Sequence, residues 1–355
     1  MTLLVTGGCG FIGTNFIRLH VSERRERIVN LDKLTYAGNR RNLEDLPESL
    51  HVLVEGDVAD GELLKRVFSE YKPRALVHLA AESHVDRSIL GPGEFVRSNI
   101  VGAFTLLEAA RGYYEGLTPP ERESFRFLSV STDEVFGSLG PEDPPFTEES
   151  PYAPNSPYSA SKAAADHLVR AYHKTYGLPV IVTNCSNNYG PYQFPEKLIP
   201  LVILNALNLK KLPVYGDGRQ IRDWLHVSDH CRALSLALEK GRPGESYNVG
   251  GGAESANIDT VRILCELLDE KRPEPAVESR ASLIEHVRDR PGHDRRYAVD
   301  CRKIERELGY RPLVRFKDGL SSAVDWYLDN PRWVESVVSG EYRNWNRRNY
   351  GESYE

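Results

Sequence analysis

The stretch Leu3–Val21, "LLVTGGCGFIGTNFIRLHV", joins a short apolar run to a helical pattern through three regularly spaced glycines. In a strand–turn–helix unit, Gly7 permits the tight turn, Gly10 lets backbone amides approach a pyrophosphate, and Gly13 lets the helix pack on the strand. The spacing G-x-x-G-x-x-G differs from the usual G-x-G-x-x-G fingerprint. The turn therefore indicates a dinucleotide-binding unit, with a merely crowded strand–helix corner as the alternative.

The alternation of strand and helix that begins in this stretch continues through the first half of the chain. Short β-branched runs predict buried parallel strands at 3–8, 27–32, 51–58, 75–81, 126–132 and 179–187. Between them, helical spacing predicts helices at 15–25, 61–71, 101–115 and 160–177. Such alternation predicts an α/β fold with a Rossmann-like, doubly wound parallel sheet.

The strand–helix alternation breaks down after about residue 185, where Gly- and Pro-rich stretches interrupt the helices. No polar linker separates the two parts, so we expect a smaller, interleaved C-terminal α/β substrate domain rather than two separate units. The predicted boundaries are 1–185 for the Rossmann domain, with a returning segment at about 220–248. Residues 186–219 and 249–340 would form the second domain, and 341–355 a C-terminal tail.

Composition narrows the class of protein. A formal net charge of −6 over 355 residues argues against a nucleic-acid binder, which would usually carry a basic stripe. The five cysteines show no C-x-x-C pattern, so neither a disulfide framework nor a metal site is predicted. No apolar run approaches the roughly 20 residues that a membrane helix needs. We therefore expect a cytoplasmic protein that binds neither nucleic acid nor membrane.

An acid at the end of the second predicted strand favours one cofactor. Asp32 closes "RIVNLD", where a ribose-binding acid belongs after a glycine-rich turn. A carboxylate there accepts from the adenosine ribose hydroxyls and would repel a 2′-phosphate, so NAD is predicted over NADP. Asp57 and Val58, in "EGDV", suit contacts to the adenine, and a simple strand-end aspartate is the alternative.

A tyrosine and a lysine four residues apart predict a proton-transfer pair. Tyr158 and Lys162, in "PYSASKAAADHL", lie on one face of a predicted helix. An ammonium group beside a phenol lowers the phenol's pKa from its usual value near 10. Such a phenolate accepts a proton from an alcohol as hydride leaves the carbon.

A hydroxyl and two adjacent acids follow the fifth predicted strand, in "SVSTDEVFG" (129–137). Thr132, Asp133 and Glu134 are either a helix cap or a catalytic group. Adjacent carboxyls in one site push their pKa values apart, which leaves one a usable acid and the other a base. We expect them to be catalytic.

Together these motifs resemble the extended short-chain dehydrogenase/reductase superfamily, and within it the dTDP-glucose 4,6-dehydratase family. The resemblance covers nearly all of the chain, through stretches at 5–16, 31–39, 78–89, 131–137, 156–179, 184–200, 222–230 and 289–300. It implies oxidation of the glucose C4 hydroxyl by NAD, loss of water across C5 and C6, and return of hydride to C6. The product would be dTDP-4-keto-6-deoxyglucose, a deoxysugar precursor of the dTDP-rhamnose type.

The resemblance also implies a role for each catalytic residue. Tyr158, supported by Lys162, is the C4 base, and Thr132 hydrogen-bonds the C4 oxygen. Glu134 removes the C5 proton, and Asp133 protonates the departing C6 hydroxyl.

The binding residues carried over from the resemblance form two sets. Cofactor contacts are expected from Gly7, Gly10, Phe11, Ile12, Gly13, Asp32, Lys33, Leu34, Thr35, Asp57, Val58, Leu79, Ala80, Ala81, Ser83, Ser98, Tyr158, Lys162 and Asn188, with Asn99 as a further candidate. Substrate contacts are expected from Ser83, Thr132, Asn187, Lys197, Leu198, Pro213, Val214, Tyr215, Arg222, Asn257, Asp289, Arg290 and His293.

Several alternatives remain open from the sequence. Another nucleotide-sugar enzyme of the superfamily is possible: a 4-epimerase, a decarboxylase, or a 4,6-dehydratase for a different nucleotide. An epimerase needs no acid–base pair at C5 and C6, so Asp133 and Glu134 argue against it. A catalytically silent NAD-binding module is a third class, against which the four intact catalytic residues speak. The helices at 96–114 and 161–177 carry apolar residues on more than one face, which predicts a homodimer.

Overall fold

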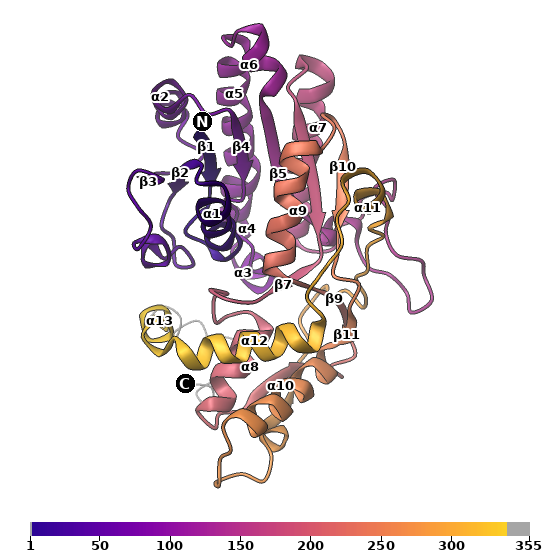
Figure 1. Ribbon diagram of the computed structural model, residues 1–355. Coiled ribbons are helices and arrows are strands. Elements are labelled where there is room, and N and C mark those ends of the chain that lie inside the picture. The colour runs from indigo at the N-terminus through magenta and orange to yellow at the C-terminus, as the bar shows by residue number, and fades with distance from the viewer. Residues whose placement is uncertain (1, 339–355) are drawn as a thin grey trace.

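The computed structural model describes residues 2–338 of the chain, so the predicted tail at 341–355 lies outside the described residues. A seven-stranded, fully parallel sheet forms the larger part (Figure 1). Its order is β10-β6-β5-β4-β1-β2-β3. The strands are β1 (Thr2–Thr6), β2 (Arg27–Asp32), β3 (His51–Glu55), β4 (Ala75–His78), β5 (Arg126–Thr132), β6 (Val180–Cys185) and β10 (Ser246–Val249).

This order confirms the predicted doubly wound sheet. Strands 3-2-1-4-5-6 follow the Rossmann arrangement, in which ligands bind outside the carboxyl ends of the strands near the point where the order reverses. All six strands predicted in the first half are present, and β10 extends the sheet beside β6.

Helices cover both faces of the sheet, because successive strand residues point to opposite sides. Leu3 and Val5 join one core with α1 (Phe11–Arg24) and α9 (Val227–Lys240). Leu4 joins the opposite core with α2 (Gly61–Tyr71), α5 (Gly102–Glu115) and α7 (Pro157–Tyr176). Figure 1 shows α1 and α9 in front of the sheet and α5 behind it.

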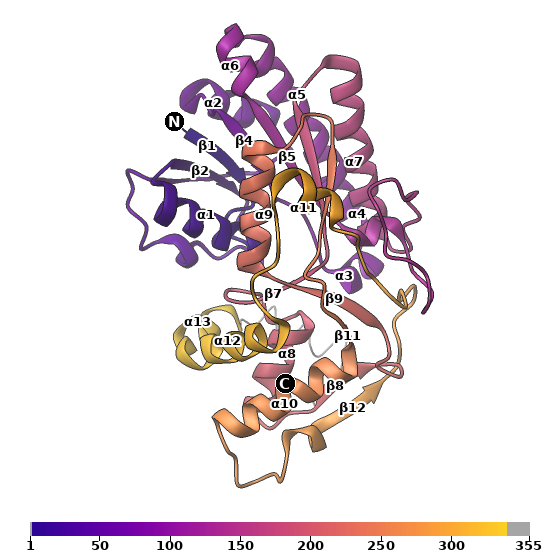
Figure 2. The same ribbon diagram turned by 45° about the vertical axis from the view of Figure 1, so that its right-hand side comes forward.

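The smaller part builds its own core from elements far apart in the chain. Its strands form a three-stranded sheet, β11-β9-β7, and a parallel pair, β12-β8. These are β7 (Asn187–Tyr189), β8 (Leu212–Tyr215), β9 (Ile221–His226), β11 (Glu254–Ala256) and β12 (Ile284–Val287). The helices that pack on them are α8 (Leu198–Leu207), α10 (Asn257–Lys271), α12 (Phe316–Asp329) and α13 (Pro331–Val337). Figure 2 shows this part below the large sheet.

The packing divides the chain somewhat differently from the predicted boundaries. The segment that returns to the large sheet consists of α9 and β10, whereas β9 pairs in the three-stranded sheet. Helix α11 (Arg302–Leu308) also packs on the large-sheet side, since Ile304 and Leu308 lie in the same core as Leu3. The predicted boundaries placed α11 in the second domain.

Short elements flank α5 on both sides, between β4 and β5. They are α3 (Val85–Leu90), α4 (Pro92–Phe95), the π-helix η2 (Val96–Val101) and α6 (Pro119–Ser124). Three 3-10 helices are η1 (Arg40–Leu43), η3 (Asp133–Phe136) and η4 (Arg280–Leu283). The π-helix was not predicted, and such turns occur frequently at functional sites.

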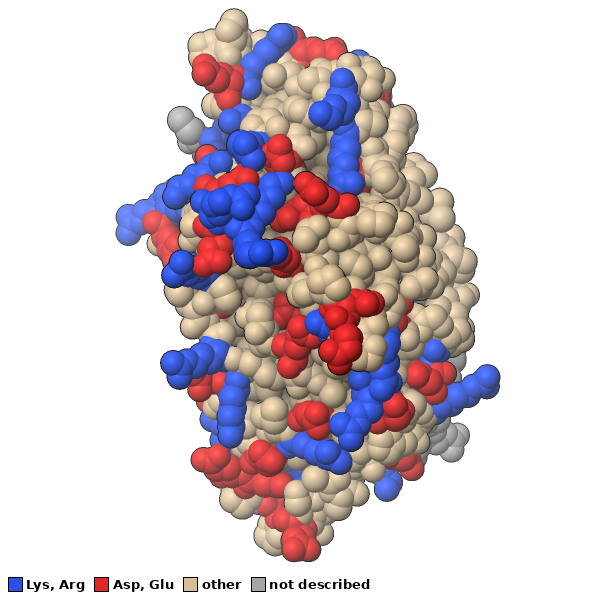
Figure 3. Space-filling model, turned by 90° about the vertical axis from the view of Figure 1, so that its right-hand side faces the viewer, with Lys and Arg blue, Asp and Glu red and all other residues tan. Residues whose placement is uncertain are grey.

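The described part of the chain holds no helix that is long and apolar enough to cross a membrane. On the face shown in Figure 3, basic and acidic side chains are interspersed, and a broad uncharged area lies to the right of them.

Candidate active site

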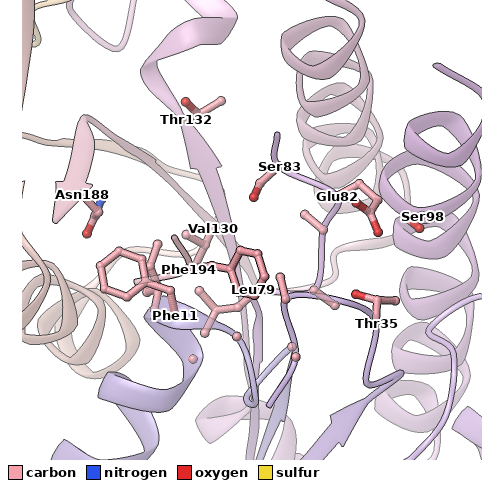
Figure 4. A pocket seen from close by; sticks show the side chains of 18 of the residues that line it. Phe11, Thr35, Leu79, Glu82, Ser83, Ser98, Val130, Thr132, Asn188 and Phe194 are labelled. Carbon is pink, nitrogen blue, oxygen red and sulfur yellow. The ribbon is translucent and has the colours of Figure 1, made fainter. Parts of the chain in front are cut away.

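A cavity of about 300 Å³ opens along the carboxyl ends of the central strands. Figure 4 shows apolar side chains, among them Phe11, Leu79 and Val130, near its centre, and polar ones, among them Thr132 and Asn188, around them. The predicted residues that line it are Gly7, Gly10, Phe11, Ile12, Gly13, Asp32, Lys33, Thr35, Asp57, Val58, Leu79, Ala80, Ala81, Ser83, Ser98, Thr132, Asp133, Glu134, Tyr158, Lys162, Asn187, Asn188 and Lys197. The cavity thus brings the predicted cofactor and catalytic residues together.

The glycine turn has no room for side chains. Gly7 has φ +73°, and a Cβ there would lie 2.6 Å from the amide nitrogen of Ala80. A Cβ on Gly13 would lie 2.3 Å from the carbonyl oxygen of Gly7. The turn is therefore a close-packed backbone cradle at the start of α1, which fits the pyrophosphate of a dinucleotide.

Asp32 is held in place by two backbone amides. Its carboxylate accepts hydrogen bonds from the nitrogens of Cys9 and Leu34, both at 2.8 Å. Burial raises the pKa of Asp32, and the two amides oppose that rise. The carboxylate lines the cavity with acceptor capacity left over, which fits an adenosine ribose. Leu34 does not line the cavity; its contribution is this amide.

Asp57, also at the rim, pairs with Lys33 at 2.9 Å and with Arg97 at 3.6 Å. Asn99, the further cofactor candidate, is not in the cavity wall. Its side-chain nitrogen donates to the hydroxyl of Ser161 at 2.8 Å and to the carbonyl of Glu82 at 2.9 Å. It therefore ties the loop after β4 to α7.

The group at the end of β5 forms a cap and faces the cavity at the same time. Thr132 Oγ1 accepts from the amide of Glu134 at 3.3 Å and so caps η3. The same hydroxyl donates to Asp133 Oδ1 at 3.3 Å. Asp133 Oδ2 is buried and has no hydrogen-bond partner among the described residues. The capping alternative is thus real, and it leaves both carboxyls on the cavity wall.

The two carboxyls differ in their electrostatic surroundings. Burial, followed by the charges of Glu134 and Asp223, raises the pKa of Asp133 well above its usual range. Burial also raises the pKa of Glu134, but Arg290, Lys197 and Arg222 oppose that rise. Asp133 is thereby favoured as the protonated partner and Glu134 as the ionised one.

Tyr158 and Lys162 line the same cavity, but their electrostatics differ from the sequence expectation. Burial and the charge of Glu134 raise the pKa of Tyr158 well above 10 instead of lowering it. The ammonium of Lys162 donates to the carbonyl of Val130 at 2.8 Å, and it is not among the main influences on the pKa of the phenol. A hydrogen bond with Thr132 lowers the pKa of Tyr158 in part.

Most predicted substrate residues lie outside this cavity, on the smaller part of the molecule. They are Leu198, Pro213, Val214, Tyr215, Arg222, Asn257, Asp289, Arg290 and His293. Val214 is 1% exposed, and its side chain packs in the second core. Its role in the wall around the base stays a prediction. Strand β8 alternates faces, and its neighbour Tyr215 is the residue that points outward.

Asp86 on α3 links this set to the large domain. Its carboxylate accepts from the hydroxyl of Tyr215 at 3.0 Å and from Arg290 at 3.3 Å. His293 packs edge-on against Tyr215 and pairs with Asp289 at 2.6 Å. We refer to Asp86, Tyr215, Asp289, Arg290 and His293 as the Asp86 cluster.

Three predicted substrate residues carry buried polar atoms that lack a hydrogen-bond partner in the described part of the chain. Asn187 Oδ1, Asn257 Oδ1 and Arg290 Nε are buried and have no hydrogen-bond partner within residues 2–338. Arg222 is 5% exposed and stacks on Tyr297, 4.3 Å from the ring centroid. Buried polar atoms are costly unless they are paired, so these atoms fit a polar ligand.

The sequence reading missed part of the cavity wall. The additional lining residues are Leu31, Ala37, Gly38, Gly56, Glu82, Val130, Ser131, Cys185, Ser186, Gln193, Phe194 and Glu196. Many directly adjoin predicted ones, as Glu82 adjoins Ser83 and Glu196 adjoins Lys197. Adjacency in the sequence to a predicted residue is the signal that could have found them. Gln193 and Phe194 lie on an irregular loop and have no such signal.

A Rossmann sheet with a glycine turn, a Tyr–Lys pair and an acid pair in one cavity defines an extended short-chain dehydrogenase/reductase. Residues 4–323 match the family described as GDP-mannose 4,6 dehydratase. The dTDP-glucose 4,6-dehydratase of Xanthomonas campestris pv. campestris (strain B100) is 59% identical over 343 residues, 96% of this chain and 97% of that protein. dTDP-glucose 4,6-dehydratase 1 of Escherichia coli (strain K12) is 54% identical over 359 residues, 99% of each chain.

Among solved structures, the dTDP-glucose 4,6-dehydratase DesIV from Streptomyces venezuelae, crystallised with NAD bound, superposes with a TM-score of 0.85. It is 48% identical, and the match covers 95% of this chain and 100% of DesIV. The chain belongs to this nucleotide-sugar dehydratase family, on the branch of the dTDP-glucose 4,6-dehydratases.

Proposed function

We propose that this protein dehydrates dTDP-glucose to dTDP-4-keto-6-deoxyglucose with tightly held NAD. The observation that carries the proposal is the placement of Asp133 and Glu134 beside Tyr158 and Lys162 in one cavity. The high identity to dTDP-glucose 4,6-dehydratases supports the substrate.

NAD, when bound, supplies the acceptor and later the donor of a hydride. Tyr158 accepts the proton of the C4 hydroxyl, and Thr132 holds the C4 oxygen. The resulting C4 ketone makes the C5 proton acidic, and Glu134 removes it. Asp133 donates a proton to the C6 hydroxyl, which leaves as water. Glu134 returns a proton to C5 as C6 is reduced, so the sugar loses one water with no net redox change.

The surroundings of the two carboxyls suit these roles. An acid must hold its proton until the hydroxyl leaves, and burial raises the pKa of Asp133 well above its usual range. A base must be ionised, and the three cations Arg290, Lys197 and Arg222 oppose protonation of Glu134. The cradle of the glycine turn and Asp32 would hold the diphosphate and ribose of the cofactor.

On the sugar-nucleotide side, the proposed contacts come from the Asp86 cluster with Arg222, Asn187 and Asn257. A guanidinium donates two parallel bonds to phosphate, which suits Arg222 and Arg290 to a diphosphate. The unpaired Nε of Arg290 supports this assignment.

Separating the two carboxyls tests the mechanism. In Asp133→Asn the amide cannot deliver a proton, so loss of water should slow by about two to four decades while C4 oxidation persists. Enzyme-bound NADH and the 4-keto-glucose nucleotide should accumulate. Glu134→Gln should stall at the same stage and also stop exchange of the C5 proton with deuterated solvent. Tyr158→Phe should form little NADH.

Stopped-flow absorbance of reduced nicotinamide, with mass spectrometry of the quenched sugar, distinguishes these outcomes. Asp259→Asn, a partly exposed acid on α10 that pairs with Arg262, is the matched control and should behave as wild type. Wild-type dehydration in both folded carboxylate variants would reduce Thr132–Glu134 to a helix cap and refute the mechanism.

We also propose a homodimer through α5 and α7. Val101, the last residue of η2, and Phe104 on α5 are 45% and 47% exposed, and Tyr176 is 50% exposed at the end of α7. The two helices contact each other, with Tyr172 donating to Glu108 at 2.7 Å. Exposed apolar side chains on two paired helices favour burial by a partner. Light scattering at micromolar concentration should give twice the 40.0 kDa chain mass. A cytoplasmic location stays a prediction.

A further inference from the structure

The last helix of the described chain, α13, contacts the connection between β2 and β3 through Trp333 and through Ser336, whose hydroxyl accepts from the side-chain nitrogen of Asn39 at 3.3 Å. Trp333 Nε1 donates to Asn42 Oδ1 at 2.7 Å, across 291 residues of sequence. Asn42 lies on η1, in the connection between β2 and β3, and is 2% exposed. Figures 1 and 2 both show α13 directly below that connection.

Asn42 also donates hydrogen bonds to the glycine turn and to the start of α1. Its side-chain nitrogen donates to the carbonyl of Cys9 at 3.2 Å and to Thr14 Oγ1 at 3.0 Å. The orientation of the amide is fixed, because an indole can only donate and a carbonyl can only accept. The amide of Cys9 in turn donates to Asp32 at 2.8 Å. A continuous hydrogen-bonded path therefore runs from α13 to the acid predicted to hold the ribose.

The turn is also fixed on its other sides. Thr14 Oγ1 donates to the carbonyl of Gly8 at 3.3 Å, and the amide of Gly8 donates to Asn30 Oδ1 at 3.0 Å. Asn42 thus supports a segment that already has little freedom. Neither Asn42 nor Trp333 lines the cavity, so any effect on the cofactor acts through the turn.

Aromatic packing holds α13 against the same region. The rings of Trp326 and Trp333 lie 4.9 Å apart, and that of Tyr192 lies 4.8 Å from Trp326. The guanidinium of Arg18, on α1, lies 5.3 Å from the Tyr192 ring and donates through Nε to the carbonyl of Asn42 at 2.9 Å. Trp326 and Trp333 share this cluster, and Trp333 is the one whose indole donates to Asn42.

We propose that Trp333 and Asn42 are positioning residues that slow the release of NAD by holding the glycine turn from the C-terminal side. The proposal rests on the NAD binding of the proposed function and not on its sugar chemistry. Retention matters because the hydride taken from C4 must return to the same sugar before the reduced cofactor leaves. The smaller part of the molecule, which would hold the sugar, thereby also secures the cofactor.

Release of NAD from the purified holoenzyme tests this. Alcohol dehydrogenase with ethanol converts released NAD to fluorescent NADH, so no sugar nucleotide is needed. Trp333→Phe keeps a ring in the cluster and removes the donor, and we expect about fivefold faster release, the effect of losing one hydrogen bond. Its kcat at saturating NAD should stay within about twofold of wild type. Trp326→Phe, the matched control, should release NAD at the wild-type rate.

Asn42→Leu tests the route. Release should be at least as fast as in Trp333→Phe, and the double variant should release NAD no faster than Asn42→Leu alone, because both changes break the same path. Equal release rates for Trp333→Phe, Trp326→Phe and wild type would overturn the proposal, as would additive effects in the double variant. If Asn42→Leu does not fold, the comparison of the two Trp→Phe variants decides alone.

Discussion

The two walls of the site are built from different kinds of contact. On the cofactor wall, backbone groups do most of the work: Asp32 is held by two amides, and Gly7 and Gly13 leave no space for a Cβ. On the substrate wall, side chains from separate elements hold one another, as in the Asp86 cluster. The cofactor wall, which is built from backbone groups, cannot change without moving a strand or helix. The side chains of the substrate wall can exchange hydrogen-bond partners when a ligand binds.

The largest effect should follow from a change in the backbone wall. In Gly13→Ala the new Cβ would lie 2.3 Å from Gly7 O and 2.6 Å from Gly8 Cα, so the turn must shift. Overpacking of this kind costs about 1–3 kcal/mol, which corresponds to roughly a five- to 150-fold loss of NAD affinity if the turn bears it. Isothermal titration of the NAD-free variant measures the loss.

Gly93→Ala is the control for this change, because a Cβ at Gly93 has no neighbour within 4 Å in the described part of the chain. It should bind NAD as wild type does. NAD affinity unchanged in Gly13→Ala would show that the cofactor wall is as adaptable as the substrate wall.

A smaller effect is expected from the side-chain wall. Asp86→Asn removes the charge that Arg290 faces at 3.3 Å and leaves one acceptor oxygen for two donors. Loss of a charged hydrogen bond should raise the KM for dTDP-glucose about tenfold. NAD release should not change, since Asp86 is not on the cofactor wall. Steady-state kinetics beside the NAD-release assay separates the two walls.

The control for Asp86→Asn is Asp217→Asn, an exposed partner of Arg295, whose loss should change neither KM nor NAD release. Faster NAD release in Asp86→Asn would show that the cofactor and substrate walls are coupled and contradict their independence.

The smallest expected effect is a shift in the pH profile of C4 oxidation. It concerns Glu134, whose charge lies near both walls. Tyr158 must lose its proton to act as base, so the rate of C4 oxidation rises as the pH passes the pKa of Tyr158. The charge of Glu134 raises that pKa. Glu134→Gln therefore lowers it and should move the rising limb to lower pH.

Single-turnover formation of NADH as a function of pH gives this limb, even though the variant cannot complete dehydration. Glu148→Gln, whose carboxylate accepts from the amide of Asn248 outside the cavity, is the control. A limb that stays in place or moves to higher pH in Glu134→Gln would contradict the electrostatic coupling of the two bases.

The sequence predicted the cofactor wall better than the substrate wall. Strands β1 to β6 and helices α1, α2, α5 and α7 were predicted, because apolar periodicity and the glycine turn are local patterns. Strand β10 and the short helices α3, α4, η2 and α6 were not. The set Thr132–Glu134 and the pair Tyr158 and Lys162, which the sequence singled out as catalytic, line one cavity. The direction of the pKa of Tyr158 was not predicted correctly, since it depends on where the ammonium of Lys162 points and on the charge of Glu134.

On the substrate wall, neighbours in sequence face opposite ways, and the reading could not tell them apart. Val214 lies in the core, while Tyr215 reaches Asp86, 129 residues earlier in the chain. Position along an edge strand sets this difference, and the irregular sequence around β8 gives no periodicity long enough to show it.

By itself, the sequence determined the Rossmann half, the glycine turn with Asp32 and the chemical types in the catalytic group, because short-range sterics and apolar periodicity are written in neighbouring residues. Only the tertiary structure decided that Asp86 meets Arg290 and that Trp333 meets Asn42. Those contacts join segments 204 and 291 residues apart, and they exist because packing of the two cores brings their surfaces together.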